Sequence, residues 1–348
     1  MAEIERGPAD DAPRRLVLTP LVRWETLLLV LLGGTIAYGA VVSPYFLQSN
    51  NLFFISLNVG EIAIMALPLT LIVVTGEIDL SVASILGLAG VLMAELFKHG
   101  WPIWPAMIMA VVLGAVLGAA NGFLVTRVGL PSLAVTIGTL TLYRGIAQGF
   151  LPTDTIGGFP AGLASIGVVP IPHTHIPYSI AFFAALAVVF GVVLHATPLG
   201  RAIFAIGAGQ EAAFFAGIRV KRIKFWLFVL SGMLSGFAGV LWTLRFASAR
   251  YDSGAGLELF VVTVVLLGGV SIFGGRGTIV GVFLAVAVLG CLQTALTQDL
   301  VPAQDQNIVV GGLLIASVIV PNAAELYRRA RLRLQSAAAR RAVHAETS

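Results

Sequence analysis

Ten long runs of apolar residues, bounded by charged residues, proline or glycine, dominate this sequence of 348 residues. A bilayer core about 30 Å thick needs roughly 20 apolar residues per helix. Runs of that length without alternation favour helices over barrel strands, because every backbone N–H and C=O must be satisfied inside the span. We therefore expect an all-α polytopic membrane protein with about ten transmembrane helices, at 25–42, 53–75, 79–97, 103–126, 131–150, 176–197, 223–247, 257–274, 277–298 and 306–322.

The overall composition agrees with a lipid environment. Hydrophobic residues make up 58% of the chain and charged residues 11%, so one soluble core could not bury the apolar side chains. We expect a cytoplasmic N-terminal segment at 1–24, a transmembrane domain at 25–322 and a basic cytoplasmic tail at 323–348. The tail either lies along anionic lipid headgroups or is simply the flank of the last helix.

The basic residues indicate which helix ends face the cytoplasm, because cytoplasmic loops carry an excess of Lys and Arg. With the N-terminus inside and an even number of helices, 17 of the 21 Lys and Arg residues fall in cytoplasmic segments. The first apolar run follows about 24 polar or mixed residues and has no small-residue cleavage site, so we expect it to remain as a helix. Both termini are therefore expected in the cytoplasm.

The residues that several kinds of chemistry need are missing from the sequence. No lysine is followed by Ser or Thr, as an ATP-binding Walker loop requires, and no His-Glu-x-x-His or Gly-x-Ser-x-Gly motif occurs. The single cysteine, Cys291, cannot form a disulfide or a cysteine-based metal site within one chain. The net charge of +4 comes from residues that border the spans, not from a nucleic-acid-binding domain. We expect no catalytic residue, no metal, no cofactor and no nucleic-acid partner.

The segment 198–222 differs from the apolar runs around it. It begins at Pro198, and glycines at 207 and 209 interrupt the backbone before 210–216, which can form about two helical turns. Gly217 can then end this helix as a C-cap glycine. A short amphipathic helix on the cytoplasmic face is either a spacer parallel to the membrane or a docking element for another protein.

Two carboxylates, Glu77 and Asp79, stand between the second and third apolar runs, in the sequence Gly-Glu-Ile-Asp-Leu-Ser-Val-Ala-Ser at 76–84. We place them on a cytoplasmic turn, where they can contact water. Asp79, two residues before Ser81, can cap the third helix by accepting hydrogen bonds from the next amides. The alternative is that Glu77, Asp79 and Ser81 form a gate or contact a partner protein.

Five motifs occur in order along the chain. They are the sequence at 76–84, Asn-Gly-Phe-Leu-Val-Thr at 121–126, Pro-Ser-Leu-Ala-Val-Thr-Ile-Gly-Thr at 131–139, Ala-Ile-Gly-x-x-x-Glu-Ala-Ala-x-x-x-Gly-Ile at 205–218, and Leu-Gly-Gly-x-Ser-x-x-Gly-Gly-x-Gly-Thr at 267–278. Together they resemble the monosaccharide ABC importer permeases of the ribose, rhamnose and autoinducer type. The resemblance extends from about 45 to 322.

This resemblance implies a permease subunit of a bacterial inner membrane, not an enzyme. Its implied partners are ABC ATPase subunits, a second permease subunit, identical or paralogous, and a periplasmic sugar-binding protein. It also implies that the helix at 210–217 is the coupling helix, which seats in a cleft of the ATPase. The coupling residues that match the family pattern are Gln210, Glu211, Ala212, Ala213 and Gly217.

Within that family the sequence is most similar to rhamnose permeases. Glu77 and Ala83 stand where ribose-type members more often have glycine, and further similarity comes from 43–47, 66–69 and 270–275. Rhamnose is therefore the expected substrate. Autoinducer or ribose-type transport is the alternative, since autoinducer permeases share Leu-Pro-Leu and a Gly-Gly-Phe-Pro loop with this chain. Two alternatives come from other classes: an ion-coupled secondary transporter that uses Glu61, Glu77 or Asp79, and a structural membrane subunit.

Polar residues inside the spans are candidates for the translocation pathway. Asn58 and Asn121 could hydrogen-bond sugar hydroxyls. Glu61 could face the same pathway or pair with Arg144 or Arg245, which the sequence alone does not bring together. Polar contacts between helices are the alternative use of such residues.

Glycine spacing and helix direction give two further expectations. The patterns Gly114-x-x-x-Gly118 and Gly232-x-x-x-Gly236 predict helices that approach closely. The second and seventh spans would run in opposite directions, which permits an inverted repeat of two halves.

Overall fold

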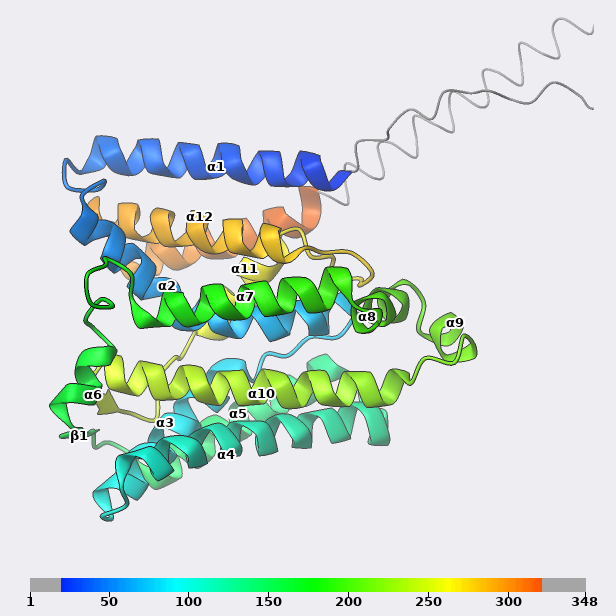
Figure 1. Ribbon diagram of the computed structural model, residues 1–348, viewed down its shortest axis with the longest axis horizontal. Helices are drawn as coiled ribbons and strands as arrows, with labels where there is room; N and C mark the ends of the chain where they lie inside the picture. The colour runs from blue at the N-terminus through cyan, green and yellow to red at the C-terminus, as the bar shows by residue number, and fades with distance from the viewer. Residues whose placement is uncertain (1–19, 321–348) are drawn as a thin grey trace, which may run out of the picture.

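The computed structural model describes residues 20–320, and within them the chain is mostly helical (Figure 1). Seven of the described helices are long and apolar enough to cross a bilayer, so the fold is that of an all-α polytopic membrane protein. The tail at 323–348 and most of the N-terminal segment at 1–24 lie outside the described residues. The helices that match the ten expected spans are α1 (Pro20–Val42), α2 (Ser49–Val74), α3 (Val82–Lys98), α4 (Ile103–Phe123), α5 (Ser132–Phe150), α7 (Tyr178–Ala196), α10 (Val220–Arg245), α11 (Leu257–Leu267), α12 (Ile279–Gln298) and a last helix, Ala303–Val320.

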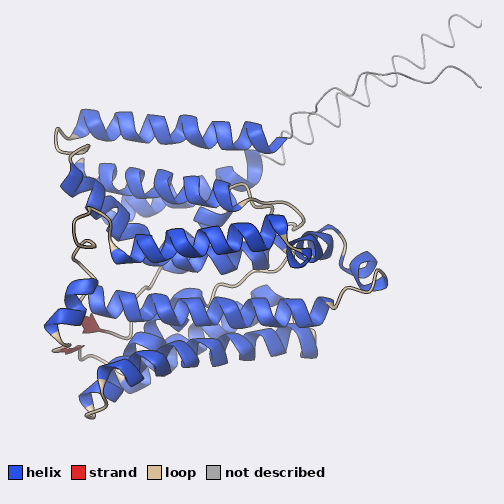
Figure 2. Cartoon of the chain, viewed as in Figure 1, coloured by secondary structure: helices blue, strands red, loops and turns tan. Residues whose placement is uncertain are grey.

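Shorter elements connect these helices (Figure 2). The π-helical turn η1 (Leu124–Val128) extends α4, and α6 (Ala161–Ile166) lies in the long connection before α7. Strands β1 (Ile156–Gly157) and β2 (Ser248–Ala249) pair in antiparallel fashion. Two short helices, α8 (Pro198–Ala208) and α9 (Gln210–Phe215), stand between α7 and α10.

Two of the expected spans are shorter in the structure. The third begins at Val82 instead of 79, because residues 75–81 form a non-helical segment in which Gly76 has a φ of 81°. The eighth ends at Leu267 instead of 274, because Gly269, Gly274 and Gly275 all adopt positive φ. At 1.5 Å per residue, an 11-residue helix such as α11 is about half as long as a bilayer core is thick. A helix of this length cannot by itself span a bilayer core.

Helix α2 occupies the centre of the bundle. Of its spanning stretch 94% is buried, compared with 17% for α1 and 22% for α7. It packs against α7, α10, α11 and α12, and its buried side chains form the main hydrophobic cluster together with theirs. A helix that is apolar all round is expected in this central position.

Helices α4 and α10 share the most extensive helix contact among the described residues, and four glycines line it. A Cβ atom added at Gly114 or Gly118 would lie inside van der Waals contact with the backbone of Gly232, and one at Gly236 would lie 2.9 Å from Ala110 O. These glycines confirm the close approach predicted from their spacing, since only hydrogen at the α-carbon leaves enough room.

The connections gather at two ends of the bundle. The start of α1, the segment 75–81, α8 and α9 lie at one end, and the β1–β2 pair and α6 lie at the other (Figure 1). Helices α2 and α10 have 26 residues each and run in opposite directions. Each is followed by a non-helical segment and then by two further helices, α3 and α4 after α2 and α11 and α12 after α10, an order compatible with the expected inverted repeat.

Candidate functional site

Helix α9 projects from the end of the bundle that also carries the segment 75–81 (Figure 1). Thr197 and Pro198 start α8, with Thr197 Oγ1 accepting a hydrogen bond from the amide of Gly200. Gly209 separates α8 from α9, and Gly217, with a φ of 84°, closes α9. The amide of Ile218 donates to Ala213 O across this turn, as expected for a glycine C-cap. The expected helix at 210–217 is present, with its last helical residue at Phe215.

Only one face of α9 contacts the rest of the chain. Ala213 is buried against Ile206 and Val220, and these three residues form a small separate hydrophobic cluster. Glu211 and Ala212 are exposed, and so are Phe214 and Phe215, at 65% and 85%. Exposed aromatic side chains of this size form an apolar patch of the kind that contacts another protein or a membrane surface.

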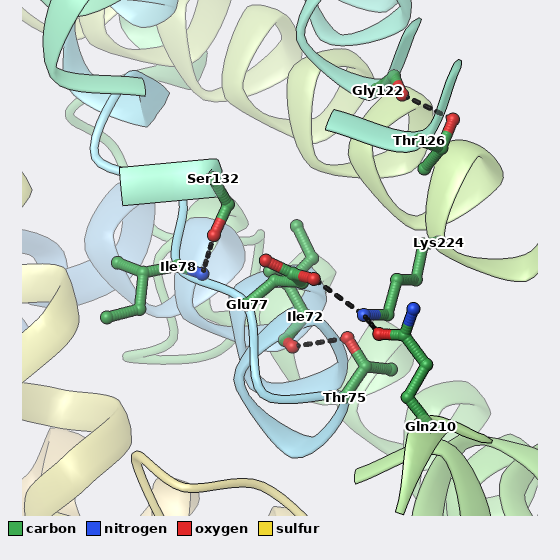
Figure 3. Close-up of polar contacts among 9 residues, drawn as sticks. All are labelled: Ile72, Thr75, Glu77, Ile78, Gly122, Thr126, Ser132, Gln210 and Lys224. Carbon is green, nitrogen blue, oxygen red and sulfur yellow. Dashed lines mark hydrogen bonds and ion pairs between the residues drawn. The ribbon is translucent and has the colours of Figure 1, made fainter. Parts of the chain in front are cut away.

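Lys224, near the start of α10, connects α9 to the segment 75–81 (Figure 3). Its ammonium group donates to Glu77 Oε1 at 2.5 Å and to Gln210 Oε1 at 2.7 Å. The lysine is only 5% exposed, so its charge depends on these acceptors, because a buried unpaired ammonium is costly. We call Lys224, Glu77 and Gln210 the Lys224 junction.

The segment 75–81 is fixed to α5 just beyond this junction. Ser132 Oγ accepts a hydrogen bond from the amide of Ile78 at 3.1 Å, as Figure 3 shows, and Thr136 Oγ1 donates to Ile78 O at 3.4 Å. Both residues belong to the first two turns of α5. A displacement of Glu77 along the chain would therefore reach α5.

Asp79 is buried inside the bundle and does not contact water, contrary to the expectation of an exposed turn. It is 0% exposed and accepts hydrogen bonds from Ser81 N at 3.0 Å, Ser81 Oγ at 2.6 Å and Ser231 Oγ at 2.8 Å. The N-cap residue of α3 is Ser81, not Asp79, and its side chain makes no capping bond. Asp79 instead fixes the residue that starts α3 and joins it to α10.

Asn121 extends this buried polar network to α4 and α5. Its Nδ2 donates to Ser81 Oγ at 2.8 Å, and its Oδ1 accepts from Tyr143 Oη at 3.1 Å. Asn121 is 0% exposed, so in this chain it makes a polar contact between helices. The network depends on Ser231 and Tyr143. No sequence motif selects these two residues, because their partners are far away in the chain.

The other two pathway candidates lie together in a second polar cluster. Glu61 is 1% exposed and pairs with Arg245 Nη1 at 3.0 Å, which settles the choice between Arg144 and Arg245. Arg245 also donates to Leu57 O at 2.9 Å and to the side chain of Asn58, which is exposed. Arg144 instead donates to Tyr251 O and Ser253 O in the connection before α11. The structure thus separates Asn58 and Glu61 from Asn121.

The clusters around Lys224, Asp79 and Glu61 consist of side chains that hold one another in place through hydrogen bonds and ion pairs. Within residues 20–320, no group of three or more His, Cys, Asp and Glu side chains could hold a metal ion. The carboxylates Glu61, Glu77 and Asp79 each have a basic or hydroxyl partner within 3.0 Å. The cluster at Lys224 is distinct because it joins a projecting helix to the interior of the bundle.

The sequence of this chain is similar to those of known transport proteins. A family model described as "Branched-chain amino acid transport system / permease component" matches residues 51–318. The autoinducer 2 import system permease proteins LsrD of Salmonella paratyphi A (strain ATCC 9150 / SARB42) and Escherichia coli (strain K12 / DH10B) are each 35% identical to this chain. The aligned regions cover 88% of this chain and 93% and 94% of those proteins. No solved structure gives a significant match.

These relatives are transport permease subunits, not enzymes, and they are described as autoinducer 2 permeases, not rhamnose permeases. The expected preference for rhamnose is therefore not supported, and the autoinducer alternative fits better. The family match and the length of the aligned regions show that the chain belongs to this permease family, as a sugar ABC importer permease of the ribose and autoinducer type.

Proposed function

We propose that this chain is the membrane permease subunit of an ABC importer for autoinducer 2. The observation that carries the substrate is the 35% identity to autoinducer 2 permeases over 88% of the chain. The proposed partners are two ABC ATPase subunits, a second permease subunit and a periplasmic binding protein. The proposed location is the bacterial inner membrane, with α9 and both termini in the cytoplasm.

Uptake in a strain that lacks the chain tests the substrate. Restoring the chain should restore uptake of labelled autoinducer 2, and excess unlabelled rhamnose or ribose should compete weakly. Uptake of rhamnose with no uptake of autoinducer 2 would contradict the proposed substrate and leave the family intact.

The coupling role that we propose for α9 rests on which of its side chains are exposed and which is buried. Glu211, Ala212, Phe214 and Phe215 are exposed, while Ala213 anchors the helix to its neighbours. Changing Glu211→Lys should lower both uptake and substrate-stimulated ATP hydrolysis several-fold, without lowering the amount of permease in the membrane. Unchanged uptake would remove Glu211 from the docking surface.

The alternative of ion-coupled transport gives a different result in vesicles. Purified permease without ATPase should not take up autoinducer 2 under a proton or sodium gradient, since Glu61 and Glu77 are paired with Arg245 and Lys224. Gradient-driven uptake by the chain alone would overturn the proposed dependence on an ATPase.

A further inference from the structure

Lys224 differs from the other basic residues around it. Four basic residues lie between 219 and 224, and three of them, Arg219, Lys221 and Arg222, are exposed. Lys224 is 5% exposed and points away from solvent. A cation that merely marks the cytoplasmic end of a helix needs no burial. Burial of this one lysine therefore needs its own explanation.

The two acceptors of Lys224 come from segments that are far apart in the sequence. Glu77 precedes it by 147 residues and Gln210 by 14. Gln210 is the first residue of α9, and Glu77 follows the central helix α2. Because the ammonium group bonds both at once, α9 cannot separate from the segment 75–81 without breaking a charge-assisted hydrogen bond in a partly buried place.

The apolar attachment of α9 is small by comparison. Ala213 supplies its buried side chain, and Ala213 has no atoms beyond Cβ with which to resist a tilt of the helix. Helix α8 is fixed more firmly, because Gly207 lies directly against Val74 O and the backbone of Gly275. The Lys224 junction therefore adds a polar contact that resists movement of α9 relative to the bundle.

On the interior side, the junction continues into the helices of the bundle. Residue 78, next to Glu77, is hydrogen-bonded to Ser132 and Thr136 of α5, and Asp79 is bonded to Ser231 of α10. A pull on Glu77 is thus transferred to the first turns of α5 within one residue. Helix α10, which carries Lys224 itself, would move with it.

We propose that Lys224 is a positioning residue that transmits displacement of α9 to the segment 75–81 and α5. This inference rests on the proposed function, since it assumes that a partner ATPase displaces α9. In this arrangement Gln210 connects the moving helix, Lys224 is the central cation and Glu77 connects the bundle. The path through α8 remains when the junction is broken, so coupling should be weakened and not abolished.

The test uses the whole importer, purified with its ATPase and reconstituted in vesicles with its binding protein. The measured quantity is the number of substrate molecules taken up per ATP hydrolysed. Lys224→Met should lower this ratio about five- to tenfold, and Gln210→Leu, which keeps the pair between Lys224 and Glu77, should lower it severalfold. Exchange of the charges, Glu77→Lys with Lys224→Glu, should restore much of it.

The matched control is Lys221→Met, one turn earlier on the exposed side of α10. It removes the same charge near the same surface and should leave the ratio unchanged. Membrane abundance and co-purification of the ATPase are measured for every variant, because a purely structural lysine would lower these and leave the ratio alone. If Lys224→Met does not fold, Gln210→Leu and the charge exchange decide the result.

An unchanged ratio in Gln210→Leu, or in a folded Lys224→Met, would overturn the transmission role. So would a charge exchange no better than the single variants. These results differ from failure of the proposed function, in which the unmodified chain would neither co-purify with an ATPase nor show ATP-dependent uptake.

Discussion

At the scale of single residues, the pair between Glu61 and Arg245 shows how this bundle accommodates charge. Both side chains are nearly buried, with 1% and 11% of their surfaces exposed, and their atoms approach to 3.0 Å. The remaining donors of Arg245 reach Leu57 O and Asn58, so the guanidinium joins α10 to two turns of α2. Removal of one partner from such a pair leaves an uncompensated buried charge.

Arg245→Met should therefore destabilise the protein by about 3–5 kcal/mol, the usual cost of breaking a buried ion pair. The measurement is the unfolding temperature of the purified permease in detergent. The double variant Arg245→Met with Glu61→Leu removes both charges and should recover most of the loss. If the single variant unfolds at the same temperature as the unmodified protein, the pair does not stabilise the fold.

The sequence predicts only part of the polar contacts that single residues make. The apolar setting of Glu61 made Arg245 one of two plausible partners, but only the packing of α10 on α2 chose between them. Asp79 was expected to cap α3 from a wet turn, and it is instead buried against Ser231, 152 residues away. Partners at that separation leave no periodic signal, so neither Ser231 nor Lys224 could be selected from the sequence.

Glu77 and Ala83 show that sequence marks of a subfamily need not report on the transported substrate. Both were used as marks of a rhamnose permease. In the structure Glu77 bonds Lys224, and Ala83 is 0% exposed within α3. Residues committed to internal contacts need not vary with the transported substrate, so Glu77 and Ala83 do not by themselves distinguish rhamnose from autoinducer 2.

At the scale of elements, the crossing of α4 and α10 depends on glycine. A Cβ atom at Gly232 would clash with the backbone of Gly114 and Gly118, which cannot move aside as a flexible side chain could. The two helices would have to separate along their most extensive contact.

Gly232→Ala should lower the unfolding free energy by about 1–3 kcal/mol, the range found for overpacked interiors. Thermal unfolding in detergent measures it. Gly191→Ala on α7 is the control, because nothing lies within 4 Å of a Cβ atom there. It should be neutral or slightly stabilising, since alanine favours a helix more than glycine does. Equal stability of the two variants would contradict the role assigned to the glycine crossing.

The positions of the helices were largely predictable from hydropathy, but their ends were not. All ten expected spans contain a helix. Hydropathy predicts them because a helix that crosses a bilayer needs a long run of apolar residues. The eighth run remains apolar through Phe273, and Gly268 and Gly269 directly after Leu267 are the one local signal for the end of α11. There Trp24 Nε1 donates to Leu267 O at 3.0 Å, and the Trp24 ring lies against Gly269. A tertiary contact from α1 thus coincides with the end of this helix.

At the scale of the whole molecule, the described chain begins and ends at the same end of the bundle, beside α8 and α9 (Figure 1). This agrees with an even number of crossings. We predict that this end faces the cytoplasm, because basic residues concentrate there.

Cysteine labelling in a Cys291→Ala background measures the orientation. Phe215→Cys on α9 should react with a membrane-impermeant maleimide only after the cells are permeabilised. Asp154→Cys, exposed at the opposite end, should react in right-side-out spheroplasts. The reverse pattern would invert the topology and separate α9 from any cytoplasmic ATPase.

One surface of this chain is better suited to contact with the expected second permease subunit than to contact with lipid. Helix α5 has 19 residues, yet it is not apolar enough to be counted among the spans. Its exposed positions include Gly138, Thr141 and Gly145, which are three or four residues apart and so share one face. Small and hydroxyl side chains on one face favour close contact with another helix over contact with lipid chains.

A photo-crosslinking amino acid at Thr141 should therefore capture a permease subunit, either a copy of this chain or its paralogue, as identified by mass spectrometry of the product. The control position is Val188, exposed on α7, where the long apolar helix is suited to lipid. Capture at Val188 and none at Thr141 would place the second subunit on the other side of the bundle. Capture at Thr141 would put the subunit contact on the helix that holds Ile78 through Ser132 and Thr136. Displacement of α9 would then reach the interface between the two permeases.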